Sequence, residues 1–71
     1  MKLSYYPDTD SLYITLSPMP SADSDEVSEG IVLDFDAAGR LVGIDIDNAS
    51  HKLDLREVVT DRIPISANAA S

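Results

Sequence analysis

The chain has 71 residues, of which 13 are acidic and 5 basic, a formal net charge of −8, and no cysteine. This length suits one small domain with a modest hydrophobic core, and neither a disulfide nor a thiolate metal site can reinforce that core. The acidity disfavours binding to nucleic acid or to an anionic membrane surface, but it permits a basic protein partner. The N-terminal sequence MKLSYYPD lacks the apolar stretch of a signal peptide, so we expect a cytoplasmic protein.

Two strands are predicted at the N-terminus, because apolar and polar side chains alternate over Lys2–Tyr6 and Ser11–Ser17. The segment between them, Pro7-Asp8-Thr9-Asp10, has the composition of a turn. A four-residue loop gives a register with two apolar pairs on one face: Tyr5 with Leu12, and Leu3 with Ile14. The other face, with Tyr6 and Tyr13, should be wet.

The next segment, Pro18–Asp23, is predicted to be a connecting loop, because its two prolines remove backbone donors and end the strand. Ser24–Glu29 could then hold an extra short strand around Val27. The acidic residues of this segment are typical of a protected sheet edge.

A central β-hairpin is predicted over Gly30–Ile46, where the runs Ile31–Phe35 and Leu41–Ile46 flank a short loop. The structural turn comprises Asp36, which opens it, Gly39, which supplies a positive φ, and Arg40, which faces Asp36. A three-residue loop fixes the remaining pairs: Phe35 with Leu41, Leu33 with Gly43, and Ile31 with Asp45.

This register predicts two apolar faces, since side chains alternate along a strand. The first face carries Ile31, Leu33, Phe35 and Leu41, and the second carries Val32, Val42, Ile44 and Ile46. A short helix can cover one face at best. We therefore expect a homodimer, with either the Phe35 side or the side of Val42 and Ile44 at the interface.

A helix is predicted over Leu55–Asp61, because Asp54 can cap it and Leu53 can pack on Val58 as a hydrophobic staple. The preceding Asp47–Ser50 favours a turn or the start of a short helix. Ile63–Ile65 could add an extended segment, and Ser66–Ser71 should be a loose tail. The expected fold is α+β: an antiparallel β-meander of about four strands, with one short C-terminal helix, in a single domain over residues 1–65.

Four stretches carry a family resemblance: Tyr5–Ile14 (YYPDTDSLYI), Glu26–Val27, Gly30–Asp36 (GIVLDFD) and Gly39–Ile46 (GRLVGIDI). They are similar to the pattern Tyr-Asp-Pro-x-x-Asp-x-Leu-Tyr-Ile, Glu-x-Val and Gly-Arg-Leu-Val-Gly-Ile-Glu of a family of small prokaryotic proteins, defined only as a domain of unknown function. Tyr6 replaces the usual Asp, and Asp45 the usual Glu. The resemblance covers about residues 1 to 50 and implies a small β-meander with a short helix. It implies no established activity, so no catalytic residue can be carried over.

No catalytic, cofactor-binding or metal site is predicted. The residues Asp34, Asp36, Gly39 and Asp45 match four positions of a calcium-binding loop. However, Ala38 stands at a ligand position, strands flank the segment, and the expected register sets Asp34 and Asp45 on opposite faces. A capped hairpin turn explains the same residues.

Three further features have a structural and a functional interpretation. His51, near Asp54, is the only histidine and is better explained as part of a solvated turn than as a base or ligand. Tyr6 and Tyr13 indicate cross-strand packing or a protein contact. Gly43 lies within a strand, which indicates either close approach by Phe35, the helix or a partner subunit, or a bulge.

Three functional hypotheses follow. The leading one is a non-enzymatic, dimeric protein-interaction module, for example an antitoxin-like companion of a small basic protein. The second is a small-molecule binder or an enzyme whose site forms at the dimer interface. The third is a structural dimer with no ligand.

Overall fold

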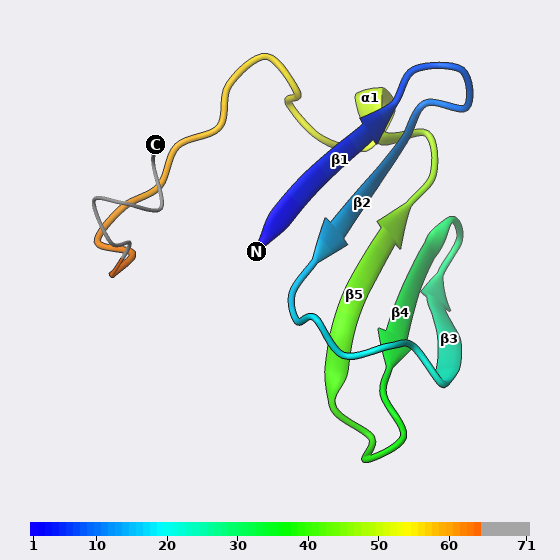
Figure 1. Ribbon diagram of the computed structural model, residues 1–71. Coiled ribbons are helices and arrows are strands. Elements are labelled where there is room, and N and C mark those ends of the chain that lie inside the picture. The colour runs from blue at the N-terminus through cyan, green and yellow to red at the C-terminus, as the bar shows by residue number, and fades with distance from the viewer. Residues whose placement is uncertain (65–71) are drawn as a thin grey trace.

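A computed structural model describes residues 1–64, which form a five-stranded antiparallel sheet and one short helix (Figure 1). The elements are β1 (Lys2–Tyr6), β2 (Ser11–Thr15), β3 (Asp23–Ser28), β4 (Ile31–Phe35), β5 (Leu41–Ile46) and α1 (Ala49–Lys52). An antiparallel sheet with one short helix is therefore confirmed. The number of strands is five instead of about four, because the acidic segment does form a strand. The predicted tail, Ser66–Ser71, lies outside the described residues.

The first hairpin has the predicted register. β1 pairs with β2 through Tyr6 and Ser11 at the turn, so that Tyr5 lies opposite Leu12. The four-residue turn ends at Asp10, whose φ is 51°. Aspartate is among the few residues that adopt this left-handed conformation readily, because its short side chain can form local hydrogen bonds.

The strand order β1-β2-β5-β4-β3 is not that of a simple meander. β2 pairs with β5 in the middle of the sheet. After β2, the chain crosses the end of the sheet and reaches the far edge, where β3 lies (Figure 1). Backbone hydrogen bonds hold both ends of this crossing: Leu16 N–H donates to the Val42 carbonyl (2.9 Å), and Ala22 N–H donates to the Phe35 carbonyl (2.7 Å). The proline-containing loop is thus a crossover connection between strands at different places in the sheet.

The predicted register of the central hairpin is wrong beyond its first pair. Phe35 does lie opposite Leu41, but Asp34 then pairs with Gly43 and Leu33 with Ile44, because β5 has a bulge at this point. One extra residue in a strand shifts every later pair by one position, and this moves side chains to the other face.

The bulge gathers the apolar side chains on one face, which we call the apolar face; the prediction of two apolar faces is therefore wrong. The residues of the apolar face are Leu3 and Tyr5 from β1, Leu12 and Ile14 from β2, Val42, Ile44 and Ile46 from β5, and Ile31, Leu33 and Phe35 from β4. On the opposite, polar face, Val32 pairs with Asp45 and Asp34 with Gly43. Asp34 and Asp45 consequently share a face, contrary to the expected register.

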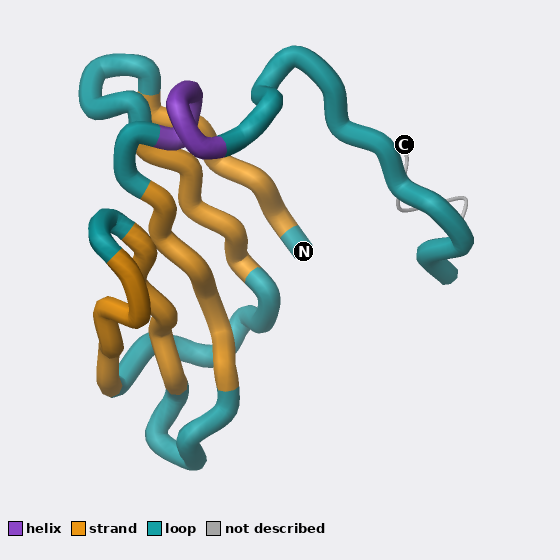
Figure 2. Tube along the Cα trace, turned by 180° about the vertical axis from the view of Figure 1, so that it is seen from behind, coloured by secondary structure: helices purple, strands orange, loops and turns teal. Residues whose placement is uncertain are grey.

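The buried core is thin and lies at one end of the apolar face. Leu12, Ile46 and Ala49 form its centre, with Leu55 packed against them. Figure 2 shows that α1 covers only the end of the sheet where β1 and β2 join. Over residues 1–64, no large side chain is less than 2% exposed. A sheet face of this size is therefore only partly covered by the chain itself.

The predicted helix over Leu55–Asp61 is wrong, and the only helix described is α1, over Ala49–Lys52. The Asp54 carboxylate accepts hydrogen bonds from the backbone N–H (3.1 Å) and Nε (3.0 Å) of Arg56 instead of capping a helix. The following β-branched residues Val58, Val59 and Thr60 favour helix weakly, and no neighbouring element packs along them to compensate.

Residues 53–64 follow α1 as a segment without helix or strand, which we call the arm. The arm passes beyond β1 and extends away from the sheet (Figures 1 and 2). Its exposed aliphatic side chains are Leu53 (37%), Val58 (70%), Val59 (73%) and Ile63 (49%). The possible extended segment over Ile63–Ile65 forms no strand as far as Pro64, and Ile65 lies outside the described residues. Within the described chain, α1 is too short to cross a bilayer.

Candidate functional site

The apolar face is a candidate binding surface. Two of its outer side chains, Leu3 and Tyr5, are 48% and 44% exposed. Of the three residues proposed for an interface, Phe35 and Ile44 are half-buried on this face and Val42 is buried in it. The structure therefore brings these three residues to one side, although the sequence assigned Phe35 to the opposite side from Val42 and Ile44.

A groove lies at the β1 edge of the apolar face, between β1 and the arm. It encloses about 610 Å³. Its lining is largely aliphatic and comes from the sheet (Leu3, Tyr5 and Leu12) and from the arm (Leu53, Leu55, Val58 and Val59, with Asp54 and Glu57). Because the groove continues the apolar face past the last strand, face and groove form one surface.

The two edges of the sheet differ in their chemistry. At one edge, β3 is exposed along its whole length, carries Asp23, Asp25 and Glu26, and has a register shift between Glu26 and Ser28. Acidic side chains and bulges are devices that prevent a strand edge from pairing with another chain. At the other edge, β1 has the sequence KLSYY, with no carboxylate and an unbroken register. The β1 edge therefore carries less protection than the β3 edge, with Lys2 as its one charged side chain.

Asp10 connects the first turn to α1, a role that sequence analysis missed. Its Oδ1 accepts hydrogen bonds from the Tyr5 hydroxyl (2.8 Å) and the Ser50 backbone N–H (3.1 Å), and its Oδ2 accepts one from the Ser50 hydroxyl (2.7 Å). The Asp10 carbonyl also accepts from the Ala49 N–H (2.8 Å). The hydrogen bonds from Ser50 and then Tyr5 lower the pKa of Asp10, and the same contact with Asp10 raises the pKa of Tyr5. The only available signal was the match of Asp10 to the second aspartate of the family pattern.

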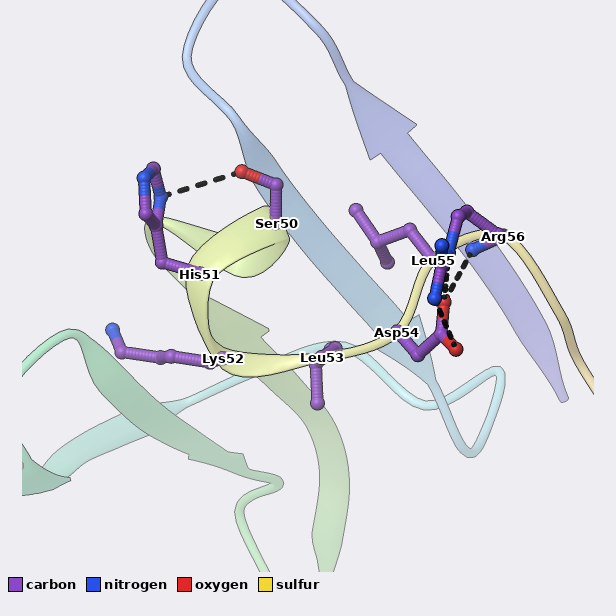
Figure 3. A pocket seen from close by; sticks show the side chains of 7 residues that line it. All are labelled: Ser50, His51, Lys52, Leu53, Asp54, Leu55 and Arg56. Carbon is purple, nitrogen blue, oxygen red and sulfur yellow. Dashed lines mark hydrogen bonds and ion pairs between the residues drawn. The ribbon is translucent and has the colours of Figure 1, made fainter.

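Ser50, His51 and Asp10 lie together but do not form the relay of a serine hydrolase. In that relay the histidine stands between the serine and the aspartate. Here Ser50 donates directly to Asp10, and His51 Nδ1 lies 3.3 Å from the Ser50 hydroxyl and 3.7 Å from Asp10 Oδ2. The His51 side chain is 82% exposed and points away from the sheet (Figure 3). The geometry suits a structural cap of α1.

The hollow in Figure 3 is lined by one continuous segment, residues 50–56. Its two ends carry separate polar contacts: the Ser50–His51 pair on one side, and the Arg56–Asp54 ion pair (3.0 Å) on the other. The Arg56 guanidinium lowers the pKa of Asp54, and Asp54 raises the pKa of Arg56. Asp54 therefore does not serve as a partner of His51, because its carboxylate pairs with Arg56.

The polar face holds a second hydrogen-bonded group that sequence analysis missed. The Tyr13 hydroxyl crosses β5 and donates to Asp34 Oδ2 (2.6 Å), and the Ser24 hydroxyl donates to Asp34 Oδ1 (2.7 Å). The hydrogen bond to Asp34 raises the pKa of Tyr13 to about 12. Asp45, on the same face, has a raised pKa, mainly because burial penalises its charged form.

Gly43 is explained by this Tyr13 contact. A Cβ atom at Gly43 would collide with the Tyr13 hydroxyl and ring. The close approach within the chain therefore comes from Tyr13 and not from Phe35 or the helix. The alternative explanation of Gly43, a bulge, also applies, because the register of β4 against β5 shifts between Asp34 and Phe35.

The turn after β4 is closed by Asp36. Its carboxylate accepts hydrogen bonds from the backbone N–H groups of Ala38 and Arg40, both at 2.9 Å, and its own N–H donates to the Arg40 carbonyl (2.9 Å). Gly39 has φ of 81°. Because these hydrogen bonds occupy Asp36 Oδ1, the calcium-like spacing corresponds to a turn motif. Over residues 1–64, no group of three or more metal-ligating side chains is suitably placed for an ion.

Comparison with known proteins identifies a family without an assigned activity. The model of the family described as "Protein of unknown function (DUF2283)" matches residues 2–50. No curated protein and no solved structure matches the chain. The matched region runs from β1 into α1 and includes the whole sheet, with Asp10, Tyr13, Asp34 and Gly43. The chain is therefore a member of the DUF2283 family.

Proposed function

We propose that this chain is a non-enzymatic protein-interaction module that acts as a homodimer. The observation that carries the proposal is the apolar face, which ten apolar side chains of four strands form and which α1 covers at one end only. Contiguous apolar patches of this kind are rare on monomers and mark interaction sites. When two chains bury such a face in a dimer, each removes the same patch from water. This burial contributes a favourable free energy of about 25 cal/mol per Å² of apolar area before association costs are subtracted.

The partner of the dimer is proposed to be a small basic protein, in the manner of an antitoxin-like companion. The support is the net charge of −8 and the acidic, fully exposed β3 strand, which lies at the opposite edge from β1. Complementary charge accelerates association and suppresses wrong partners. A basic protein would then bind at β3 while the apolar contact holds the two copies together.

Sedimentation equilibrium at micromolar concentration tests the dimer. The expected result is a concentration-dependent mass that approaches twice 7.7 kDa. The matched variants are Ile44→Ser on the apolar face and Thr15→Ser on β2. Ile44→Ser should shift the distribution to monomer, whereas Thr15→Ser should leave it unchanged. A mass of one chain at every concentration would contradict the proposal.

A second candidate, a small-molecule binder or enzyme with a site at the dimer interface, is favoured by one observation. The aliphatic groove at the β1 edge adjoins a segment that carries Ser50 and His51, so a second copy could close a pocket with polar groups at its rim. Thermal shifts across a panel of metabolites and metal ions would test it. A shift that requires both His51 and the dimer would favour this candidate over the interaction module.

A further inference from the structure

We propose that two copies of this chain join their sheets edge to edge through β1, antiparallel across a two-fold axis centred on Ser4. This inference rests on the proposed function, because it specifies the contact by which the homodimer forms. The result is one continuous sheet of two chains with both apolar faces on the same side, so that the apolar face of each chain is buried by the arm of the other chain and not by its apolar face.

The first argument is that, among the described residues, β1 is the less protected of the two sheet edges. The β1 strand has one side paired with β2 and the other side free in the described structure. Its free edge presents unpaired backbone donors and acceptors, which recruit another strand unless something blocks them. The β3 edge is blocked by carboxylates and by its register shift.

Charge selects the same edge. A chain with a net charge of −8 can approach its own copy most easily where it carries no carboxylate. Lys2 is the one charged side chain in β1, whereas β3 has three acidic side chains. Pairing through β3 would set like charges opposite each other, and this destabilises a strand pair.

The register follows from the alternation of β1 and from the place of Ser4 at the middle of this strand, Lys2–Tyr6. A two-fold axis at Ser4 sets Leu3 of each copy opposite Tyr5 of the other, and Lys2 opposite Tyr6. Leu3 and Tyr5 lie on the apolar face, so the contact joins apolar side chains to apolar ones, and the polar pairs fall on the polar face. A shift by one residue would remove this match.

The groove and the arm fit an added strand. The groove lies beside the β1 edge, with Leu3 and Tyr5 on one side and Val58 and Val59 on the other. The arm runs beyond β1 on the side where the second copy would lie (Figures 1 and 2). A second β1 strand therefore occupies the groove, and the exposed valines of each arm contact the apolar face of the other copy.

Disulfide trapping tests the contact, since the chain has no cysteine of its own. Directly opposed residues of antiparallel strands have Cα atoms about 4.5–5.5 Å apart, within the span of a disulfide. Ser4→Cys should therefore form a covalent dimer under mild oxidation. The matched control, Ser28→Cys in the opposite edge strand β3, should remain monomeric under denaturing, non-reducing electrophoresis. Equal trapping of both variants, or none with Ser4→Cys, would overturn the inference.

A second pair of variants avoids the need for oxidation. Leu3→Lys places a charge on the β1 edge, where the native side chain is already 48% exposed, and should raise the dimer dissociation constant at least tenfold. Val27→Lys makes the same change in β3, where valine is 54% exposed, and should leave the constant unchanged. If the wild type dimerises but Leu3→Lys has no effect, this contact is wrong and the proposed function stands. If the wild type is monomeric, both are wrong.

Discussion

At the scale of single residues, Gly43 has its identity because Tyr13 lies across it. The Tyr13 side chain starts on β2, passes over the backbone of β5 and reaches Asp34 on β4, so it links three strands. A larger residue at position 43 would push the ring away and leave the partly buried Asp34 with one hydrogen-bond donor fewer.

Gly43→Ala should therefore destabilise the protein by about 1–3 kcal/mol, the usual cost of overpacking. The cost should fall sharply in a Tyr13→Ser background, because the added methyl group then meets no ring. Chemical denaturation of the four proteins in this double-mutant cycle provides the measurement. An equal cost in both backgrounds would show that Tyr13 is not the reason for the glycine.

Asp10 provides a prediction of pH dependence. Its pKa is lower in the folded state than the unfolded value of about 3.9, because Ser50 and Tyr5 donate to its charged form. The resulting stability is complete above the unfolded pKa and is lost as the pH falls through the folded pKa. Asp10→Asn should thus lower the melting temperature at pH 7.

The difference in melting temperature between Asp10→Asn and the wild type should shrink below about pH 4, as the wild-type carboxylate takes up its proton. Asp8→Asn, in the same turn, is the control for a general change in charge and should not show this profile. A constant difference from pH 3 to pH 7 would mean that the ionised Asp10 is not what anchors α1.

At the scale of elements, the local sequence pattern correctly predicted those structures that contacts between nearby residues determine. The first hairpin has its expected register because the alternation and the four-residue turn belong to one short, continuous stretch of the chain. The bulge in β5 depends instead on contacts that cross strands: Tyr13 and Asp34 lie 21 residues apart. Gly43 within a strand was the one local sign of it.

The helix was misplaced for a similar reason. Asp54 and Glu57 have capping-box spacing, but Asp54 is bound to Arg56 two residues later. The helix that does form is held by Asp10, whose side chain reaches Ser50 from 40 residues away in the sequence. Asn48, the residue before α1, makes no capping hydrogen bond with its side chain. A cap supplied from so far along the chain cannot be inferred from spacing.

The arm allows a prediction about the dimer that is separate from folding. Val58 and Val59 are so exposed that replacing both with serine should change the stability of the isolated monomer by less than about 0.5 kcal/mol. The same double variant should weaken dimerisation several-fold, because in the proposed dimer both side chains contact the other copy. The control is Thr60→Ser, a neighbouring exposed position. Unchanged dimerisation of the double variant, measured by sedimentation, would mean that the arm takes no part.

At the scale of the whole molecule, charge and apolar surface oppose each other in self-association. Each chain brings a net charge of −8, so two copies repel at long range, whereas the proposed contact through β1 and the apolar face is attractive at short range. Salt screens the repulsion over a Debye length that falls from about 10 Å at 0.1 M to about 3 Å at 1 M, and it leaves the apolar contact intact. The proposed binding of a basic protein to β3 is instead favoured by the attraction between opposite charges, which salt weakens.

The homodimer should consequently tighten as sodium chloride is raised from 0.05 to 0.5 M, whereas a complex with a basic protein should weaken over the same range. Sedimentation equilibrium at the two salt concentrations measures the first effect directly. The double variant Asp25→Asn, Glu26→Gln, which removes two exposed carboxylates of β3, should reduce the salt dependence of the dimer without abolishing it. A dimer that dissociates when salt is added would instead be held by ion pairs. The apolar face, and the β1 contact that continues it, would then not be what joins the two chains.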